Sequence, residues 1–134
     1  MPAEPDAIEL AVDLVDAAED KKATDLTILE VADVLAVVDC FVLATTGSDR
    51  QLKAVAESIE ERAREHERRP LRREGRAESG WVLLDFGDVV CHLFSAEQRE
   101  FYSLERLWAD TPRIDPHTGE RLAPVAPGLG ADGR

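Results

Sequence analysis

The stretch Gly80-Trp-Val-Leu-Leu-Asp-Phe-Gly-Asp-Val-Val-Cys-His-Leu-Phe94 decides the fold of this chain. Two apolar runs flank a Gly-Asp pair, and this pattern predicts two antiparallel strands joined by a tight turn at Gly87 and Asp88. If Gly87 and Asp88 are the two turn residues, Trp81 pairs with Phe94, Leu83 with His92 and Asp85 with Val90. A turn at Phe86-Gly87 would change these partners but not the faces, whereas a three-residue turn would exchange the faces of the second strand. A hairpin this apolar must be covered on both faces, and in a short chain one cover can be another protein.

The two faces of the predicted hairpin differ in chemistry, because successive strand residues point to opposite sides of a sheet. The apolar face belongs to the core and holds Val82, Leu84, Phe86, Val89, Cys91 and Leu93. The other face mixes Trp, Leu, Asp, His and Phe, which suits recognition, since tryptophan buries a large area and a carboxylate can pair with Arg or Lys of a partner. The alternative is that Trp81 packs under a helix, with Asp85 and His92 at its rim.

Further helices and strands are predicted on both sides of the hairpin. Helices are expected over residues 6–22 and 48–67 and from residue 96, and strands over 25–31, 39–46 and, at the sheet edge, within 68–79. Capping boxes begin the first two helices, formed by Asp6 with Glu9 and by Ser48 with Gln51. This order of elements predicts an α/β fold with a single mixed sheet flanked by helices.

The folded domain is expected to comprise residues 1–110. A chain of 134 residues has room for one domain with one core of ordinary size. From Thr111 onward prolines and glycines recur without periodic apolar residues, so residues 111–134 are predicted to form a disordered tail.

Charge is abundant and unevenly distributed along the chain. The net charge of −12 excludes binding along bare nucleic acid as the main activity, because phosphate contact needs clustered Lys and Arg. Residues 1–33 carry ten acids against two lysines, whereas Arg62 to Arg76 carries seven arginines against three glutamates. This layout suits a basic protein partner on one side and phosphate on the other, although both segments can equally be solvated faces.

The two cysteines, Cys40 and Cys91, each lie inside an apolar strand-like run. They are expected to be buried free thiols of a reduced, cytoplasmic protein, and a disulfide between them stays open as the minor alternative. No segment resembles a secretory signal or a membrane span.

Catalytic interpretations of the sequence find little support. Cys91 and His92 are adjacent in a strand, so they point to opposite faces and cannot form a nucleophile–base pair. The cysteines and histidines show no zinc-ligand spacing, and no cofactor is expected. Two alternatives stay open, which are a lone base at His92 beside Asp85 and an anion or nucleotide site at the Gly47-Ser48 loop, where a helix begins.

Three segments together resemble the ribosomal silencing factor (RsfS) or Iojap family. They are Asp39-Cys-Phe-Val-Leu-Ala-Thr-Thr-Gly-Ser48, the hairpin Gly80 to Phe94, and Arg99-Glu-Phe-Tyr-Ser-Leu-Glu-Arg-Leu-Trp108. The resemblance implies a nucleotidyltransferase-like fold without the catalytic carboxylates of that fold. The sequence agrees, because no strand carries two acids one residue apart.

The resemblance also implies a function without chemistry. Members of the family form homodimers, bind universal large-subunit ribosomal protein fourteen and obstruct joining of the small subunit. Carried onto this sequence, the partner surface comprises Trp81, Leu83, Asp85, Asp88, Tyr102 and Glu105. Tyr102 would hydrogen-bond at the rim of this surface, and a minor contact with ribosomal RNA through Arg62 to Arg76 is an added possibility.

Overall fold

The computed structural model describes residues 2–102, 106 and 109–122, without the side chains of Phe101 and Tyr102. Its elements are α1 (Pro5–Glu19), β1 (Thr24–Glu30), β2 (Cys40–Thr46), α2 (Asp49–Glu65), β3 (Arg72–Arg76), the 3-10 turn η1 (Ala77–Ser79), β4 (Trp81–Asp85), β5 (Val89–Ser95), α3 (Ala96–Tyr102), β6 (Arg113–Ile114) and β7 (Arg121–Leu122).

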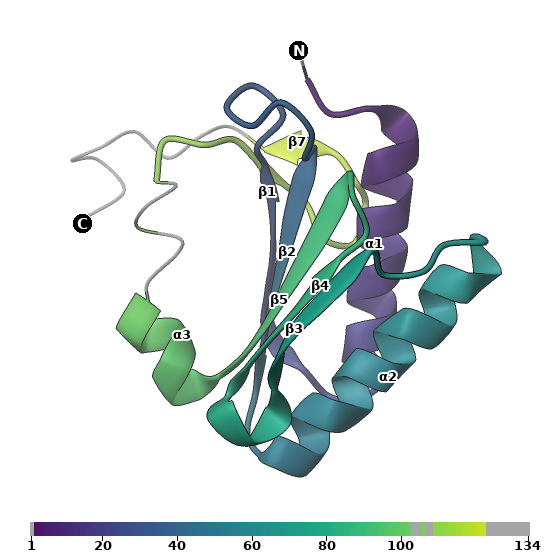
Figure 1. Ribbon diagram of the computed structural model, residues 1–134. Coiled ribbons are helices and arrows are strands. Elements are labelled where there is room, and N and C mark those ends of the chain that lie inside the picture. Colours follow the sequence, from purple (N-terminus) through teal and green to yellow (C-terminus); the bar gives the residue numbers. More distant parts are fainter. Residues whose placement is uncertain (1, 103–105, 107–108, 123–134) are drawn as a thin grey trace.

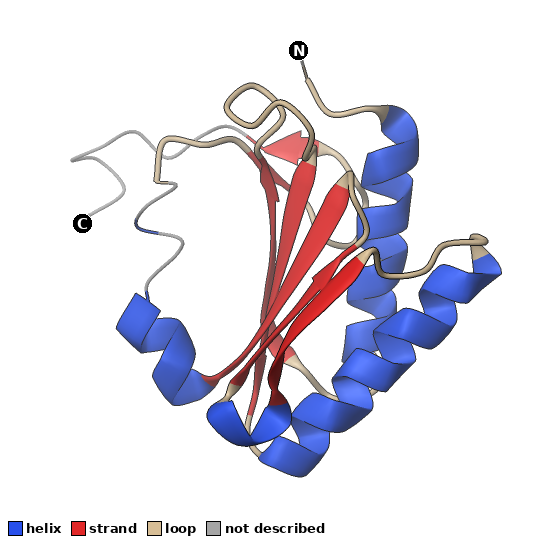
Figure 2. Ribbon diagram, viewed as in Figure 1, coloured by secondary structure: helices blue, strands red, loops and turns tan. Residues whose placement is uncertain are grey.

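The strands form one mixed sheet in the order β3-β4-β5-β2-β1-β6-β7. The central pair β2 and β5 is parallel, and the other neighbours run antiparallel. Figure 1 shows α1 and α2 side by side on one face of the sheet and α3 beyond the other face, at one end. The predicted fold class, an α/β domain with a single mixed sheet and flanking helices, is therefore confirmed, and Figure 2 shows its layers.

The hairpin has the predicted register. Trp81 pairs with Phe94, Leu83 with His92 and Asp85 with Val90. The turn residues are Gly87 and Asp88, because the Phe86 amide donates to the Val89 carbonyl at 2.9 Å, and Gly87 adopts the positive φ of 97° that such a turn requires. All six residues of the apolar face are buried in the main core, together with residues of α1 and α2.

The starts of the two long helices differ in how well the sequence predicted them. Ser48 caps α2 as expected, accepting a hydrogen bond from the Gln51 amide at 3.0 Å. The capping box at Asp6 is wrong, since α1 begins at Pro5 and its N-cap residue, Glu4, makes no side-chain cap bond. Proline is suited to the first helical position because its missing N–H would have no intrahelical partner there.

The predicted disordered tail is wrong for residues 111–122, which we call the C-terminal strap. β6 pairs with β1, β7 pairs with β6, and Ile114 is fully buried in the main core. Arg121 forms an ion pair at 2.9 Å with the buried carboxylate of Glu30, which also accepts a hydrogen bond from the Ala3 amide at 2.8 Å. Because β1 offers an unpaired edge and Glu30 needs a cation, a segment rich in proline and glycine still packs.

Both cysteines are free and buried, as expected. Burial raises the pKa of the Cys40 thiol to about 12 and raises that of Cys91 as well, so neither is a thiolate near neutral pH. Among the described residues, no helix is both long and apolar enough to cross a membrane.

Candidate functional site

The sheet face turned away from α1 and α2 carries a group of rings from β2 and from the two hairpin strands, β4 and β5. We call Phe41, Trp81, Leu83, His92 and Phe94 the aromatic face. The Trp81 ring lies 5.3 Å from Phe94 and 6.4 Å from His92, measured between centroids. The Phe41 ring meets His92 edge-on at 4.9 Å, and the His92 and Phe94 rings are nearly parallel at 6.0 Å.

The aromatic face is less completely covered than the main core. Its small buried cluster contains Leu29, Val31, Leu43 and Phe94, with Phe41 and Trp81 packed against it as half-buried side chains. Leu83 is also half-buried. A half-buried tryptophan beside buried rings is typical of an interface anchor, because a partner can remove much further apolar area from water.

His92 is unusual because its polar ring is buried without a hydrogen-bond partner among the described residues. Its exposed fraction is 7%, and among the described residues neither ring nitrogen finds a hydrogen-bond partner. Burial lowers the pKa of His92 to about 4, so the imidazole is neutral at physiological pH. A neutral ring keeps one bare nitrogen as an acceptor and one N–H as a donor.

The two hairpin acids already have partners within the chain. Asp88 forms an ion pair with Arg68, which also donates to the Phe86 carbonyl at 2.7 Å. Asp85 accepts a hydrogen bond from the Gly87 amide at 2.8 Å, and its second oxygen lies 3.7 Å from the Arg72 guanidinium. Both carboxylates therefore stabilise the turn and the edge strand, and a partner's cations would have to share them.

The geometry does not support the two alternatives, a base at His92 beside Asp85 and an anion site at the Gly47-Ser48 loop. Asp85 and His92 are not brought together, because Asp85 stands opposite Val90 and its carboxylate is engaged at the turn. At the Gly47-Ser48 loop, the Gly47 amide donates to the Gln51 side chain at 2.6 Å and Ser48 caps α2. These groups satisfy one another, so the loop is a helix cap with fewer amides left for an anion.

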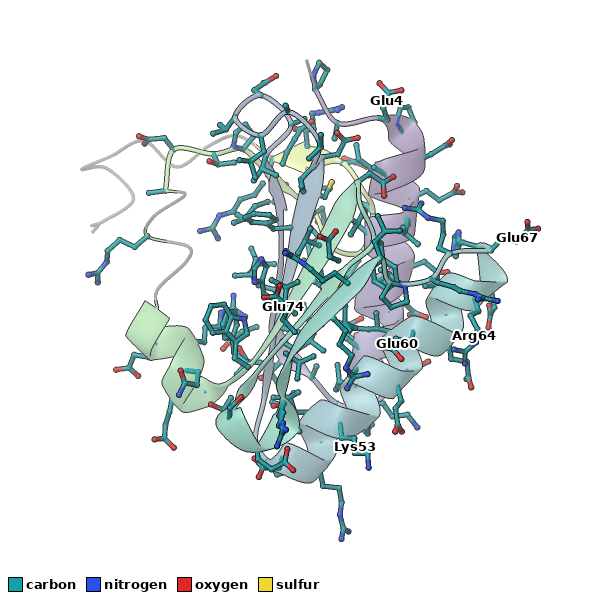
Figure 3. The ribbon with its side chains drawn as sticks, viewed as in Figure 1. Glu4, Lys53, Glu60, Arg64, Glu67 and Glu74 are labelled. Carbon is teal, nitrogen blue, oxygen red and sulfur yellow. The ribbon has the colours of Figure 1, made fainter. Side chains whose placement is uncertain are left out.

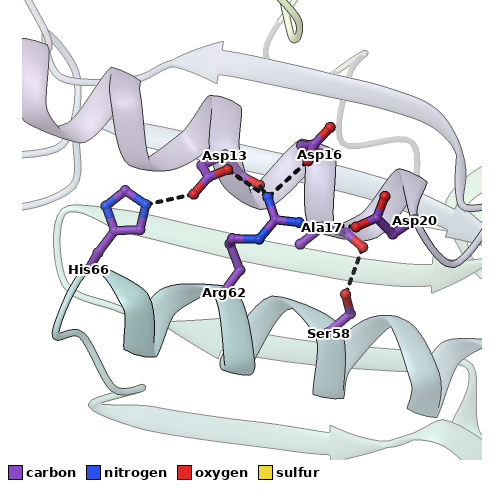
Figure 4. A network of polar contacts seen from close by, with 7 residues as sticks. All are labelled: Asp13, Asp16, Ala17, Asp20, Ser58, Arg62 and His66. Atoms are coloured by element: carbon purple, nitrogen blue, oxygen red, sulfur yellow. Dashed lines mark hydrogen bonds and ion pairs between the residues drawn. The ribbon is translucent and has the colours of Figure 1, made fainter.

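The arginine-rich segment is largely committed to the fold. Arg62 bonds to Asp13 at 2.6 Å, Asp16 at 2.9 Å and Asp20 at 3.0 Å, and thereby joins α2 to α1 (Figure 4). Within the described chain the exposed arginines of this segment without an ion pair are Arg64, Arg69 and Arg76, and Figure 3 shows Arg64 pointing away from the sheet.

Two residues on this side of the sheet, Phe41 and Arg99, were not identified as site residues from the sequence. Phe41 lies on a strand without alternation, so its face could not be assigned before its pairing partners were known. Arg99 is 8% exposed and binds Thr45 at 2.9 Å and Thr27 at 3.0 Å, which ties α3 to β1 and β2. The sequence also predicts Tyr102 and Glu105 as partner residues. The side chain of Tyr102 and the whole of Glu105 lie outside the described residues.

A family model described as "ribosomal silencing factor during starvation" matches residues 4–127. The chain belongs to the ribosomal silencing factor (RsfS) family. RsfS from Bacillus subtilis is 39% identical over 99 residues, which are 74% of this chain and 84% of that protein. The chloroplastic Iojap protein of Zea mays is 32% identical over 110 residues, which are 82% of this chain and 48% of that protein.

Solved structures support the same assignment. A crystal structure from Chromobacterium violaceum superposes with a TM-score of 0.71 at 33% identity, covering 75% of this chain and 83% of that one. Another from Bacillus halodurans gives 0.69 at 32% identity, covering 84% and 99%. The resemblance predicted from the three sequence segments is thus confirmed, and membership of the RsfS family makes the chain a ribosome-associated silencing factor instead of an enzyme.

Proposed function

We propose that the chain silences translation by binding universal ribosomal protein fourteen of the large subunit through its aromatic face. Occupation of that protein would keep the small subunit from joining, so the mechanism is steric. The observation that carries this assignment is the half-buried Trp81, which packs beside Phe94 on the sheet face that α1 and α2 leave uncovered.

The proposed contact surface combines one anchor with a polar rim. Trp81 and Leu83 would supply apolar area, and Asp85 and Asp88 would share their carboxylates with basic groups of the ribosomal protein. The Tyr102 side chain and Glu105 are proposed to extend this rim. The net charge of −12 suits a basic protein as the partner.

Two further features belong to the same proposal. The family resemblance implies a homodimer, which light scattering would show as twice the mass of one chain. A minor contact with ribosomal RNA is proposed for Arg64, Arg69 and Arg76, the exposed arginines that have no ion pair within the described chain.

Sedimentation with purified large subunits tests the proposal directly. At micromolar concentration and near physiological salt, the protein should pellet with large subunits and should stay in the supernatant with small subunits alone. Added in excess, it should also reduce the fraction of subunits that form whole ribosomes. Failure to pellet with large subunits would sink the proposal.

The variant Trp81→Ala identifies the surface used. It should weaken large-subunit binding at least about fivefold, equivalent to more than about 1 kcal/mol, while the domain remains folded. Leu122→Ala is the matched control, because Leu122 is a 44% exposed leucine on β7, at the edge of the sheet away from the hairpin, and it should bind like the wild type. Loss of folding in Trp81→Ala without a separate binding defect would instead make Trp81 a packing residue.

A further inference from the structure

His92 departs from a general rule of protein interiors. Buried polar atoms in folded proteins nearly always have a hydrogen-bond partner, and exceptions call for a specific explanation. Both ring nitrogens of His92 are buried, and neither has a partner among the described residues. Local rules of this kind are most often broken at functional sites.

Among the described residues, no polar group forms a hydrogen bond with this ring. Phe41 stands edge-on to the imidazole, Phe94 lies nearly parallel to it, and Leu83 is its cross-strand neighbour. The nearest acid along this face of the hairpin, Asp85, already accepts from the Gly87 amide and lies by Arg72. In the described chain, therefore, His92 contacts the rings of Phe41, Trp81 and Phe94, and neither of its nitrogens has a hydrogen-bond partner.

The cover over His92 includes side chains at the surface. Phe41 and Trp81 pack beside it but are themselves only half-buried. Rotation of either ring is a side-chain motion that leaves the strands in place, and packing against a docked partner can replace the packing that the ring gives up. The imidazole therefore lies directly beside two half-buried rings of the surface on which a partner is proposed to sit.

We propose that His92 is a polar anchor of the aromatic face, which accepts a hydrogen bond from an N–H donor of the bound ribosomal protein. This inference rests on the proposed function and deepens it. Since the imidazole is neutral, its bare nitrogen can accept a hydrogen bond near pH 7, and a basic protein is rich in suitable donors. In the free protein the ring is kept at a cost to stability, which binding recovers.

The variant His92→Phe separates stability from binding. Replacing an unsatisfied buried polar ring by an apolar ring of similar shape should raise the melting temperature, by about 3 °C. Loss of one hydrogen bond to the partner should weaken large-subunit binding about five- to tenfold. His92→Gln, which keeps an acceptor, should bind more tightly than His92→Phe. Cys91→Val is the matched control, because it alters the next residue of β5 on the opposite face and should leave the affinity unchanged.

The outcomes distinguish this inference from the function on which it rests. If the wild type does not bind large subunits, the proposed function itself fails. If the wild type binds and His92→Phe binds equally well, only the anchor is refuted. A lower melting temperature of both His92→Phe and His92→Leu would also refute it, since the imidazole would then be satisfied in the free protein, for example by a trapped water.

Discussion

The uncharged state of His92 has a consequence for stability that can be measured without a partner. Burial holds the pKa of the folded-state imidazole at about 4, whereas a histidine in the unfolded chain titrates near 6.5. Between pH 4 and pH 6.5, the histidine binds a proton in the unfolded chain but stays neutral in the folded chain. The buried imidazole therefore does not lower the stability further above pH 6.5, whereas the free energy of unfolding falls as the pH drops from 6.5 toward 4.

We expect the free energy of unfolding of the wild type to fall by up to about 3 kcal/mol more than that of His92→Phe between pH 7 and pH 4. Denaturant titrations of both proteins at pH 7, 5.5 and 4 give the two curves, and their difference isolates His92 from the carboxylates. Parallel curves would mean that the ring is protonated in the folded state and not buried as described.

Single residues also show where prediction from sequence reaches its limit. The pairing of Trp81 with Phe94 follows from alternation and from a Gly-Asp turn, which are local signals. The ion pairs of Arg68 with Asp88 and of Arg121 with Glu30 join residues 20 and 91 positions apart. No local sequence pattern relates residues so far apart. The sequence therefore predicts that the carboxylates of Asp85 and Asp88 are available to a partner, although Asp88 is already paired with Arg68.

At the scale of elements, the contact between α1 and α2 is held by a polar network over its apolar seam. Arg62 reaches Asp13, Asp16 and Asp20, while His66 bonds to Asp13 at 2.7 Å (Figure 4). Burial would raise the pKa of Asp13, but the hydrogen bonds from His66 and Arg62 outweigh it and hold that pKa below its usual value. The carboxylate thus contributes stability near neutral pH that is lost as the pH falls through its folded-state pKa.

Removing the cation from this network should loosen the two helices. Arg62 is only 17% exposed, whereas Asp16 and Asp20 are more than half exposed and screened by water, so we expect Arg62→Met to cost about 1–2 kcal/mol at pH 7. The cost should shrink as the pH falls through the lowered folded-state pKa of Asp13 and its carboxylate becomes protonated. Arg64→Met, on the exposed side of the same helix, is the control and should be nearly neutral. Denaturant unfolding at pH 7 and pH 3 measures all three proteins, and an equal cost at both pH values would contradict an electrostatic role.

The C-terminal strap shows why composition misled at this scale. Its strands contain only two residues each, too few for periodicity to register. The strap packs because β1 presents an open edge and because the buried Glu30 requires a positive partner. Both reasons lie in residues 24–30, far from the segment itself, so the sequence of the strap alone predicts disorder.

At the scale of the whole molecule, the two faces of the sheet have different roles. The face under α1 and α2 contains most of the buried apolar residues, and the aromatic face contains a second cluster of only four. Stability can therefore come from the first face, while the second keeps a partly exposed tryptophan and an unsatisfied histidine. This division explains why the hairpin tolerates features that a packed core would exclude.

The net charge of the chain adds a long-range electrostatic interaction with the proposed partners. A chain with a net charge of −12 is attracted to a basic ribosomal protein and repelled by the phosphates of ribosomal RNA. With isolated ribosomal protein fourteen, we expect the association rate to fall steeply as salt rises from about 50 to 300 mM, because electrostatic steering is screened. The dissociation rate should change little with salt but should rise in Trp81→Ala, since apolar anchors act on dissociation.

Surface-binding kinetics with the isolated protein and with whole large subunits separate the two electrostatic terms. Phosphates near the binding site oppose the approach of an acidic chain, so association with the whole subunit should depend less steeply on salt than association with the isolated protein. A variant with Arg64, Arg69 and Arg76 changed to Gln should associate more slowly with the subunit if these arginines contact RNA. Its association with the isolated protein should not slow, because the variant is more negatively charged than the wild type. An association rate with the isolated protein that is indifferent to salt would contradict charge complementarity and leave the aromatic face alone to select the partner.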